Sequence, residues 1–292
     1  MDDRSIQEIV DLLTLKKIDE NTFQGENYTT PWGRVFGGQV LGQSLHAAYQ
    51  SVPKDRFAHS MHAYFILGGQ LDIPIIYEVD SIRDGKSFTT RRVVAKQNGV
   101  AIFNMSASFH KKEEGIDHQI PMPNVIKPEN LIPTVEQINE LETSAPKIYK
   151  RIKNMLPTVF DIRPVENFLS KYSKNSPPYD NLWFTSAVKL NRDDVALNHQ
   201  LLAYASDYNL LSTATAPHRE ELNTKSMFYT SLDHALWFHR DFSIDDWLLY
   251  AMDSPSASNS RGFARGSIFN KNGDLVASVA QEGLIREQIK KA

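Results

Sequence analysis

The sequence predicts an α+β fold in which a long helix packs against a curved antiparallel β-sheet, with this unit present twice. Each half of the 292-residue chain contains one apolar helical stretch followed by four runs rich in β-branched and aromatic residues. The dipeptides Asn98-Gly99 and Asn272-Gly273 lie between corresponding runs, and Asn-Gly is one of the strongest hairpin signals. A sheet that wraps around its helix buries the apolar face of both elements.

The first half follows this order after an amphipathic N-terminal segment, MDDRSIQEIVDLLTL, that we expect to be helical. A loop rich in Pro and Gly precedes apolar residues at helical spacing, which predict a helix from about Gln39 to Tyr49. The four predicted strands that follow are SMHAYFIL, IPIIYEVDSIR, SFTTRRVVAKQ and VAIFNMSASFH.

The second half repeats these elements after a segment of different character. Residues 116–165 are Pro-rich and polar and then helix-forming, so we predict a linker with surface helices rather than a core. This linker separates an N-terminal domain at 1–115 from a C-terminal domain at 166–292, each expected to bury its own core. The predicted elements of the second half are the strand WFTSAVKL, the helix HQLLAYASDYNLLS and the strands FYTSLDHALWFHR, DDWLLYAMDSPSA, RGFARGSIFNK and LVASVAQEGLI.

Composition excludes several kinds of protein. The net charge of −3 gives no reason to predict a nucleic-acid or membrane surface. Zero cysteines exclude disulfides, thiolate metal sites and a cysteine nucleophile, and the scattered histidines predict no metal site. The chain starts with acidic residues rather than a signal peptide, and no apolar run reaches the roughly 18 residues of a membrane span. We therefore expect a cytoplasmic protein.

Three polar residues interrupt apolar stretches of the second half: Asp207, Ser231 and Gln281. A buried polar group without a partner costs about 1–3 kcal/mol, so these residues are expected to satisfy one another or to hold a common water. Each has an ordinary alternative. Asp207 can pair with His199, Arg219 or local backbone, Ser231 can bond within its sheet, and Gln281 can reach solvent at a strand end.

Alignment of the two copies shows which residues of the first copy correspond to these three polar residues. We align His62-Ala63 with His234-Ala235, and the two Asn-Gly pairs with each other. In the last strand of each copy, alternating apolar residues then place Gln281 on the inward face, where the first copy has Ala107. His46 and His59 roughly match Asp207 and Ser231, so the first copy lacks the three polar residues. We expect one catalytic centre per chain.

Motifs over nearly the whole chain resemble those of the acyl-CoA thioesterase II family, which hydrolyses medium- and long-chain acyl-CoA and has a double hotdog fold. The motifs are VFGGQVLGQSLHAA (35–48), HSMHAYF (59–65), DGKSFTTRRVVAKQNGVAIF (84–103), IRPVE (162–166), LLAYASDYNLL (201–211), SLDHALWFHR (231–240), WLLYAMDSPSASNSRGFARG (247–266) and VASVAQEG (276–283). By position, the family's catalytic Asp, Ser or Thr, and Gln fall on Asp207, Ser231 and Gln281. The family's Leu-Arg-Pro-Gly after HAYF is Ile66-Leu67-Gly68-Gly69 here, which loses a positive charge.

This resemblance implies an acyl-CoA thioesterase that releases free fatty acid and CoA without a metal or organic cofactor. A thiol with a pKa near 8.5 leaves readily, so one carboxylate and two neutral groups can activate a water for direct attack. No GxSxG nucleophile elbow occurs, which disfavours a serine-esterase mechanism. The alternatives are an enoyl-CoA hydratase-like enzyme and a non-catalytic acyl-CoA-binding hotdog protein.

We also predict residues that contact the substrate. Backbone N–H groups of Gly37 and Gly38, at the start of the first helix, are candidates to polarise the thioester carbonyl, although these glycines equally suit tight helix packing. We assign substrate binding to His59 as well. For the CoA phosphates we predict Arg91, Arg261 and Arg265, whose alternative is a solvated strand face. The resemblance implies a fatty acyl-CoA substrate and a homodimer or homotetramer. From the composition we expect no nucleic acid and no membrane as partners.

Overall fold

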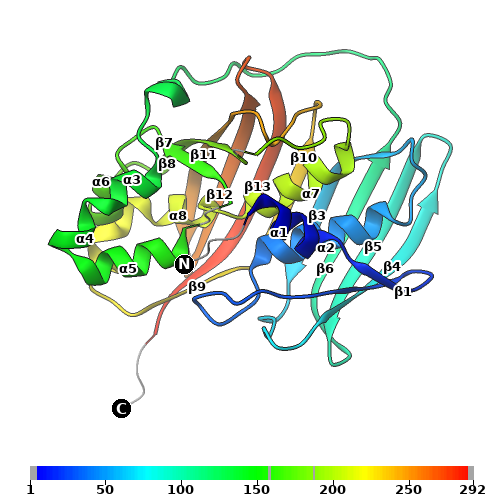
Figure 1. Ribbon diagram of the computed structural model, residues 1–292, viewed down its shortest axis with the longest axis horizontal. Coiled ribbons are helices and arrows are strands. Elements are labelled where there is room, and N and C mark those ends of the chain that lie inside the picture. The colour runs from blue at the N-terminus through cyan, green and yellow to red at the C-terminus, as the bar shows by residue number, and fades with distance from the viewer. Residues whose placement is uncertain (1–4, 157–158, 187, 289–292) are drawn as a thin grey trace.

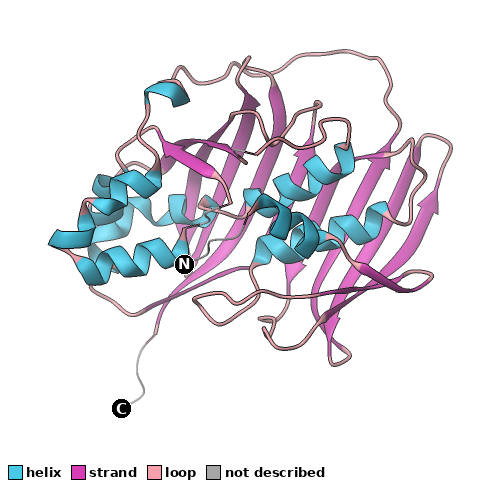
Figure 2. Ribbon diagram, viewed as in Figure 1, coloured by secondary structure: helices cyan, strands magenta, loops and turns pink. Residues whose placement is uncertain are grey.

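The computed structural model describes residues 5–156, 159–186 and 188–288, and its helices lie mostly on one side of a large sheet (Figure 2). The helices of the first half are α1 (Ile6–Leu13) and α2 (Gly37–Tyr49). Its strands are β1 (Lys16–Asp19), β2 (Thr22–Gly25), β3 (Phe57–Phe65), β4 (Ile75–Asp84), β5 (Phe88–Gln97) and β6 (Val100–His110). The four predicted strands of this half are therefore confirmed, and β1 and β2 add a short hairpin that the sequence analysis missed.

The rest of the chain contains the linker helices and the second sheet half. The linker forms η1 (Pro128–Asn130), α3 (Thr134–Asn139), α4 (Leu141–Ser144) and α5 (Pro146–Met155), and β7 (Asp161–Pro164) and α6 (Phe168–Ser173) follow. The second half then has β8 (Tyr179–Thr185), α7 (Val195–Ser206), α8 (Leu210–Thr215), η2 (Ala216–His218), α9 (Arg219–Leu222), β9 (Met227–Ser231), β10 (Asp233–Phe238), β11 (Leu248–Ser258), β12 (Arg261–Asn270) and β13 (Leu275–Glu287). Parts of two predicted segments, residues 1–4 and Ala187, lie outside the described residues.

The strands of both halves join into one antiparallel sheet. Their order across the described residues is β1-β2-β4-β5-β6-β3-β10-β13-β12-β11-β8-β7, and β9 pairs with β13 beside this path. The two halves meet where β3 pairs with β10. The predicted α+β class with two long helices against an antiparallel sheet is confirmed, and the two curved sheets are continuous with each other.

The helices α2 and α7 lie next to each other against the inner face of this sheet (Figure 1). A Cβ added at Gly38 would lie 2.3 Å from the Tyr204 carbonyl oxygen, and one at Gly42 would lie 3.1 Å from the Gln200 carbonyl oxygen. Glycine at both positions therefore permits the close approach of the two helices. Buried residues of both halves belong to one hydrophobic core as a result. The two halves therefore share a core, whereas the sequence analysis expected each half to bury a core of its own.

Two predicted elements of the second half are broken in the structure. The stretch HQLLAYASDYNLLS forms α7 and α8 rather than one helix, because Asn209 adopts a left-handed conformation with φ of 66°. Asparagine tolerates this conformation better than most residues. The stretch FYTSLDHALWFHR forms β9 and β10, with Leu232 between them. Both breaks occur next to a predicted catalytic residue.

The alignment of the two copies is out of register by one residue in β3 and β10. His62 is exposed on the outer face of the sheet, whereas His234 is fully buried on the inner face. A shift of one residue along a strand moves every side chain to the opposite face. Met61, which is also fully buried, lies opposite Ala107 in the first copy, so Met61 rather than His62 is the counterpart of His234.

The linker is more than a connection between halves. Its helices contain a small hydrophobic core formed by Ile138, Tyr149 and Ile152, with partly buried apolar residues around it. In Figure 1 these helices gather beside α8 at the end of the second half.

No helix in the described part of the chain is long and apolar enough to cross a membrane.

Candidate active site

Asp207 lies at the C-terminal end of α7, where this helix meets the N-terminus of α2. A Cβ added at Gly37 would lie 2.7 Å from Asp207 Oδ2, so the carboxylate lies directly against the first residue of α2. The other oxygen, Oδ1, is buried and has no hydrogen-bond partner among the described residues. A buried carboxylate oxygen without a protein partner is suited to accept a proton from a bound water.

Ser231 and Gln281 lie beside this carboxylate and bond to each other. Gln281 Nε2 donates to Ser231 Oγ at 2.7 Å. Gln281 is 1% exposed and Ser231 is half-buried, so the amide is held inside the sheet while the hydroxyl remains accessible. The structure therefore brings together the three polar residues that the sequence analysis singled out, and the predicted inward orientation of Gln281 is confirmed.

His234 fixes the orientation of the Gln281 amide. Gln281 Oε1 lies 2.6 Å from His234 Nδ1, and because an amide oxygen only accepts, Nδ1 carries the proton of this bond. His234 Nε2 lies 2.9 Å from the Ser206 hydroxyl. A chain of buried hydrogen bonds thus runs from α7 through His234 and Gln281 to Ser231, and it leaves the Gln281 amino group directed at Ser231.

The surroundings of Asp207 raise the pKa of its carboxyl to about 6. The cause is burial, which disfavours the charged form, while the Gly38 N–H, the Gln281 amide and the Ser231 hydroxyl lower the pKa in part. At neutral pH the carboxylate is therefore ionised and more basic than an ordinary aspartate. Burial lowers the pKa of His234 to about 4, so this imidazole is neutral at the same pH.

Gly37 and Gly38 hold the positions predicted for them. The N-cap of α2, Phe36, makes no side-chain cap, so the first N–H groups of the helix receive no capping oxygen from this residue. The Gly38 N–H faces the Asp207 carboxylate. The Gly37 N–H has no intrahelical partner because it is the first of the helix. Of the predicted pair, Gly37 is the group left to polarise a carbonyl.

A cavity of about 370 Å³, the Ser231 cavity, leads from the surface to this site. Gly37 and Ser231 line its inner part, and Phe65 and Phe228 are among its aromatic residues. Arg34 is the only charged residue among its described lining residues, and the Arg34 guanidinium carbon lies 5.3 Å from the centroid of the Phe228 ring. An exposed arginine at the mouth of a cavity is a candidate partner for a phosphate group.

His59 does not lie in this site, and its predicted role in substrate binding is not supported. It lines a different cavity, of about 380 Å³, together with His199 and Asp241. This cavity is at the opposite end of α2: Tyr49, the last residue of the helix, accepts from the Ala58 N–H at 2.9 Å. A helix of this length separates Gly37 and Tyr49 by roughly 18 Å.

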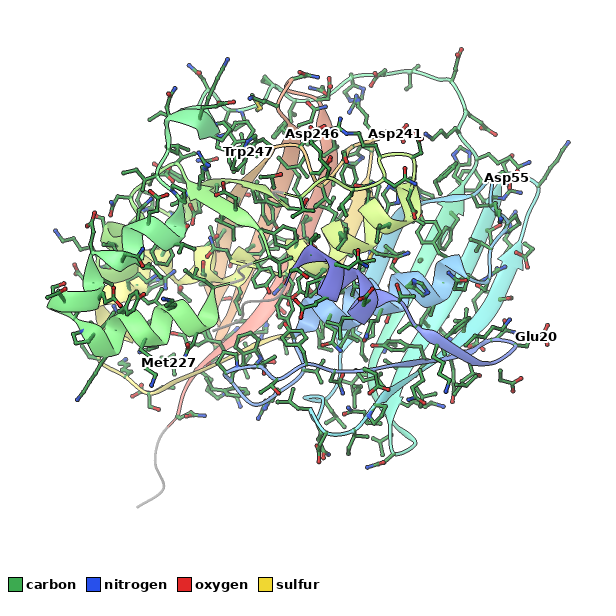
Figure 3. All side chains as sticks on the ribbon, viewed as in Figure 1. Glu20, Asp55, Met227, Asp241, Asp246 and Trp247 are labelled. Atoms are coloured by element: carbon green, nitrogen blue, oxygen red, sulfur yellow. The ribbon has the colours of Figure 1, made fainter. Side chains whose placement is uncertain are left out.

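Figure 3 labels one residue of the cavity at His59 and one residue of β9. Asp241, which lines the cavity at His59, is labelled near the upper edge of the molecule, and Met227, the first residue of β9, is labelled at the lower left. The strand β9 carries Ser231 at its other end.

Arg91 is not available to a phosphate, so its predicted role is wrong. It is 3% exposed, and its guanidinium donates to the Ser51 and Arg83 carbonyls and to Asp84. The pattern SFTTRR contained no sign of this, because alternation indicates which face a residue occupies but not which partners it meets there. Through these hydrogen bonds, Arg91 links the end of β4 to the turn that follows α2.

Arg261 and Arg265 lie on the outer face of the sheet. They alternate along β12 with Ala264, which lies opposite Gln281 on the inner face. Arg261 pairs with Glu282 and Arg265 with Asp253. The structure does not bring either arginine into the site, and their contact with CoA phosphates stays a prediction.

Within the described residues, no group of His, Asp and Glu is arranged to hold a metal ion.

Sequence reasoning missed His234 and Arg34. His234 lies in an aromatic strand, where a histidine is ordinarily structural, and the one-residue error in the alignment concealed that the first copy has a methionine in its place. Arg34 was passed over as part of a loop. The signal that could have identified it is its position three residues before Gly37, at the start of the predicted helix.

Comparisons with known proteins agree with the fold and with the motifs. The family model described as acyl-CoA thioesterase matches residues 166–284, and the model described as acyl-CoA thioesterase N-terminal domain matches residues 27–110. Acyl-CoA thioesterase 2 of Haemophilus influenzae is 37% identical over 96% of this chain and 98% of its own length. Human acyl-coenzyme A thioesterase 8 is 36% identical over 95% of this chain and 88% of its own length.

Solved structures give the same result. An acyl-CoA thioesterase II, TesB2, from Mycobacterium marinum has a TM-score of 0.79 and 36% identity, covering 98% of this chain and 99% of that protein. A conserved protein with a hot dog fold from Alicyclobacillus acidocaldarius has a TM-score of 0.75 at 17% identity, covering 97% and 99%. The predicted double hotdog fold is thereby confirmed. With two family models matching most of its length and relatives above one third identity, the chain belongs to the acyl-CoA thioesterase family.

Proposed function

We propose that this protein hydrolyses medium- to long-chain fatty acyl-CoA to free fatty acid and CoA by direct attack of a water that Asp207 activates. The observation that carries the proposal is the buried, unpartnered Oδ1 of Asp207 beside the bonded pair of Ser231 and Gln281. Membership of the acyl-CoA thioesterase family supports the reaction class. None of the comparisons favours a hydratase or a non-catalytic binding protein.

The steps balance without a cofactor. Asp207 takes a proton from water while the water oxygen forms a bond to the thioester carbonyl carbon, and the Gly37 N–H stabilises the developing oxyanion. Collapse of the tetrahedral intermediate breaks the carbon–sulfur bond. The CoA thiolate receives the proton from Asp207, which returns the carboxylate to its starting form. Ser231 and Gln281 orient the water throughout and are neither protonated nor deprotonated.

Replacement of Asp207 by Asn tests this mechanism. The variant keeps the shape of the side chain but cannot accept a proton, so we expect kcat to fall by a factor of at least about 100. Binding of a non-hydrolysable acyl-CoA thioether, measured by calorimetry, should remain. Ser231→Ala is expected to lower kcat, and the matched variant Ser231→Thr, which keeps a hydroxyl, to preserve it. Full turnover by Asp207→Asn would overturn the mechanism.

The substrate class is tested separately from the mechanism. Release of free thiol is measured with palmitoyl-CoA and octanoyl-CoA, and hydration of crotonyl-CoA is measured in parallel. We expect thiol release without hydration. Hydration alone would indicate a hydratase-like enzyme, and binding without either reaction would indicate a non-catalytic acyl-CoA-binding protein.

The cytoplasmic location and the homodimer or homotetramer predicted from the sequence belong to the same proposal. The subunit number is measured by light scattering on the purified chain, where a monomer would contradict the prediction. Cell fractionation followed by immunoblotting measures the location, and recovery outside the cytoplasmic fraction would contradict it.

A further inference from the structure

A second cavity lies near Asp207 and shares no described lining residue with the Ser231 cavity. This linker cavity, of about 310 Å³, lies between the linker helices and the second half of the sheet. Its volume is within the range of small-molecule sites in proteins, which begins near 300 Å³. The linker contributes Ile152 and Leu156 to its wall, and the sheet contributes Leu182 and Phe184.

The linker cavity adjoins the residues around the catalytic carboxylate. Ala205 and Tyr208, which flank Ser206 and Asp207 in the chain, both line it. Tyr250 lines it as well, and the Tyr250 hydroxyl donates to the Ser206 carbonyl at 3.0 Å. The charge of Asp207 contributes to raising the pKa of Tyr250. Asp207 is therefore close in the chain to residues that line the linker cavity, and its carboxylate lies against Gly37, which lines the Ser231 cavity.

An acyl-CoA has a phosphate-bearing part and an apolar acyl chain. The two cavities differ in the same way, because one has an arginine and the other a mainly apolar wall. Arg34 stands at the mouth of the Ser231 cavity, where a phosphate-bearing group can meet it. The wall of the linker cavity is mainly aliphatic and aromatic. Its charged residues are Asp180, which accepts from Asn209 Nδ2 at 3.0 Å, and Arg219, which donates to the Ser212 carbonyl at 3.1 Å. A wall of this kind favours a ligand that has no polar atoms along its length.

We propose that the linker cavity binds the acyl chain of the substrate, and that α5 of the linker limits the length of chain that fits. This inference rests on the proposed thioesterase function, because it assumes that the thioester carbonyl is held at Asp207. Ile152 is 3% exposed on the side of α5 that faces the cavity. Each methylene that binds there contributes about 0.8 kcal/mol, so each one kept out lowers kcat/KM by about fourfold.

Substitutions on α5 and at its C-cap, Leu156, test the proposal. Ile152→Trp and Leu156→Trp narrow the cavity from two positions, of which the half-buried Leu156 tolerates a larger side chain better. Ile148→Trp is the matched control, because Ile148 lies on the same helix but is 46% exposed and does not line the cavity. The full-length protein is assayed for thiol release with acyl-CoA substrates from hexanoyl-CoA to palmitoyl-CoA.

We expect the two cavity variants to lower kcat/KM for palmitoyl-CoA at least tenfold and to change it for hexanoyl-CoA by less than twofold. The control should leave the whole series unchanged. An unaltered chain-length profile in both cavity variants would overturn the proposal, as would an equal loss at every chain length in both. Absence of thiol release by the wild-type protein with any acyl-CoA would instead overturn the proposed function.

Discussion

At the scale of single residues, the chemistry of the site depends on the contrast between Asp207 and His234. Burial acts on both side chains but in opposite directions: it raises the pKa of the carboxyl to about 6 and lowers the pKa of the imidazole to about 4. Above pH 4 the His234 imidazole is neutral. Around pH 6 the Asp207 carboxyl is therefore the group of this pair that gains or loses a proton. This contrast supports the proposed roles of Asp207 as the base and His234 as a positioning residue.

The pH dependence of the rate follows from this contrast. The base must be ionised to accept a proton, so kcat/KM is expected to rise about tenfold per pH unit below pH 6 and to level off above it. Phosphate groups titrate near the same pH, with a second pKa of about 6. An acyl-pantetheine substrate without the nucleotide therefore serves as the control. A rate that stays constant from pH 5 to 7 with this substrate would contradict the role of Asp207.

Variants of His234 test its role in positioning Gln281. His234→Leu removes the donor to Gln281 Oε1 and leaves that buried oxygen unsatisfied, at a cost of about 1–3 kcal/mol, which corresponds to about 5- to 150-fold in rate. We expect this loss in kcat with little change in KM. His234→Asn retains a donor at the place of Nδ1 and should recover most of the rate. Equal losses in both variants would indicate a purely structural role.

At the scale of elements, the site exists because three segments end at one point. The helix α7 ends at Asp207, β9 ends at Ser231, and α2 begins at Gly37. A helix end supplies what the interior of a helix cannot, which is N–H groups without intrahelical partners. The sequence pattern predicted the elements themselves, but the apolar stretches around Asp207 and Ser231 concealed both breaks.

The approach of α2 to α7 can be tested at Gly38. A Cβ there would lie 2.3 Å from the Tyr204 carbonyl oxygen, so Gly38→Ala must push the two helices apart. We expect a loss of about 1–3 kcal/mol in the free energy of unfolding, as for other overpacked sites, together with lower kcat because Asp207 moves. The control is Gly115→Ala, where a Cβ would have no neighbour within 4 Å. Urea unfolding of both variants measures the difference, and equal stability would contradict the packing argument.

At the scale of the whole molecule, the two halves depend on each other. The pairing of β3 with β10 makes one sheet, and the contact of α2 with α7 makes one core. The proposed catalytic residues come from the second half, while the N-terminus of α2 and Arg34 come from the first. The proposed domain boundaries at 115 and 165 stay a prediction about the chain and do not divide the buried core.

A shared core predicts cooperative unfolding. We expect the amide hydrogens of β5, in the first half, and of β12, in the second, to exchange through the same global opening as urea is added. Hydrogen exchange with mass spectrometry measures both strands in one experiment. Distinct opening free energies for the two strands would show that each half is stable alone, as the sequence analysis first expected.

The sequence by itself determined the kind of elements, their order and repetition, and which polar residues lie inside apolar runs. Periodicity carries this information, because it records the face of a helix or strand on which a side chain lies. The tertiary structure decided which of these residues meet. In the tertiary structure Gln281 bonds to Ser231, and His234 points to the inner face, where it bonds to Gln281. Arg91 is buried among local hydrogen-bond partners, and His59 lies at the far end of α2. Those outcomes depend on register and on distances between elements, which a pattern within one element does not contain.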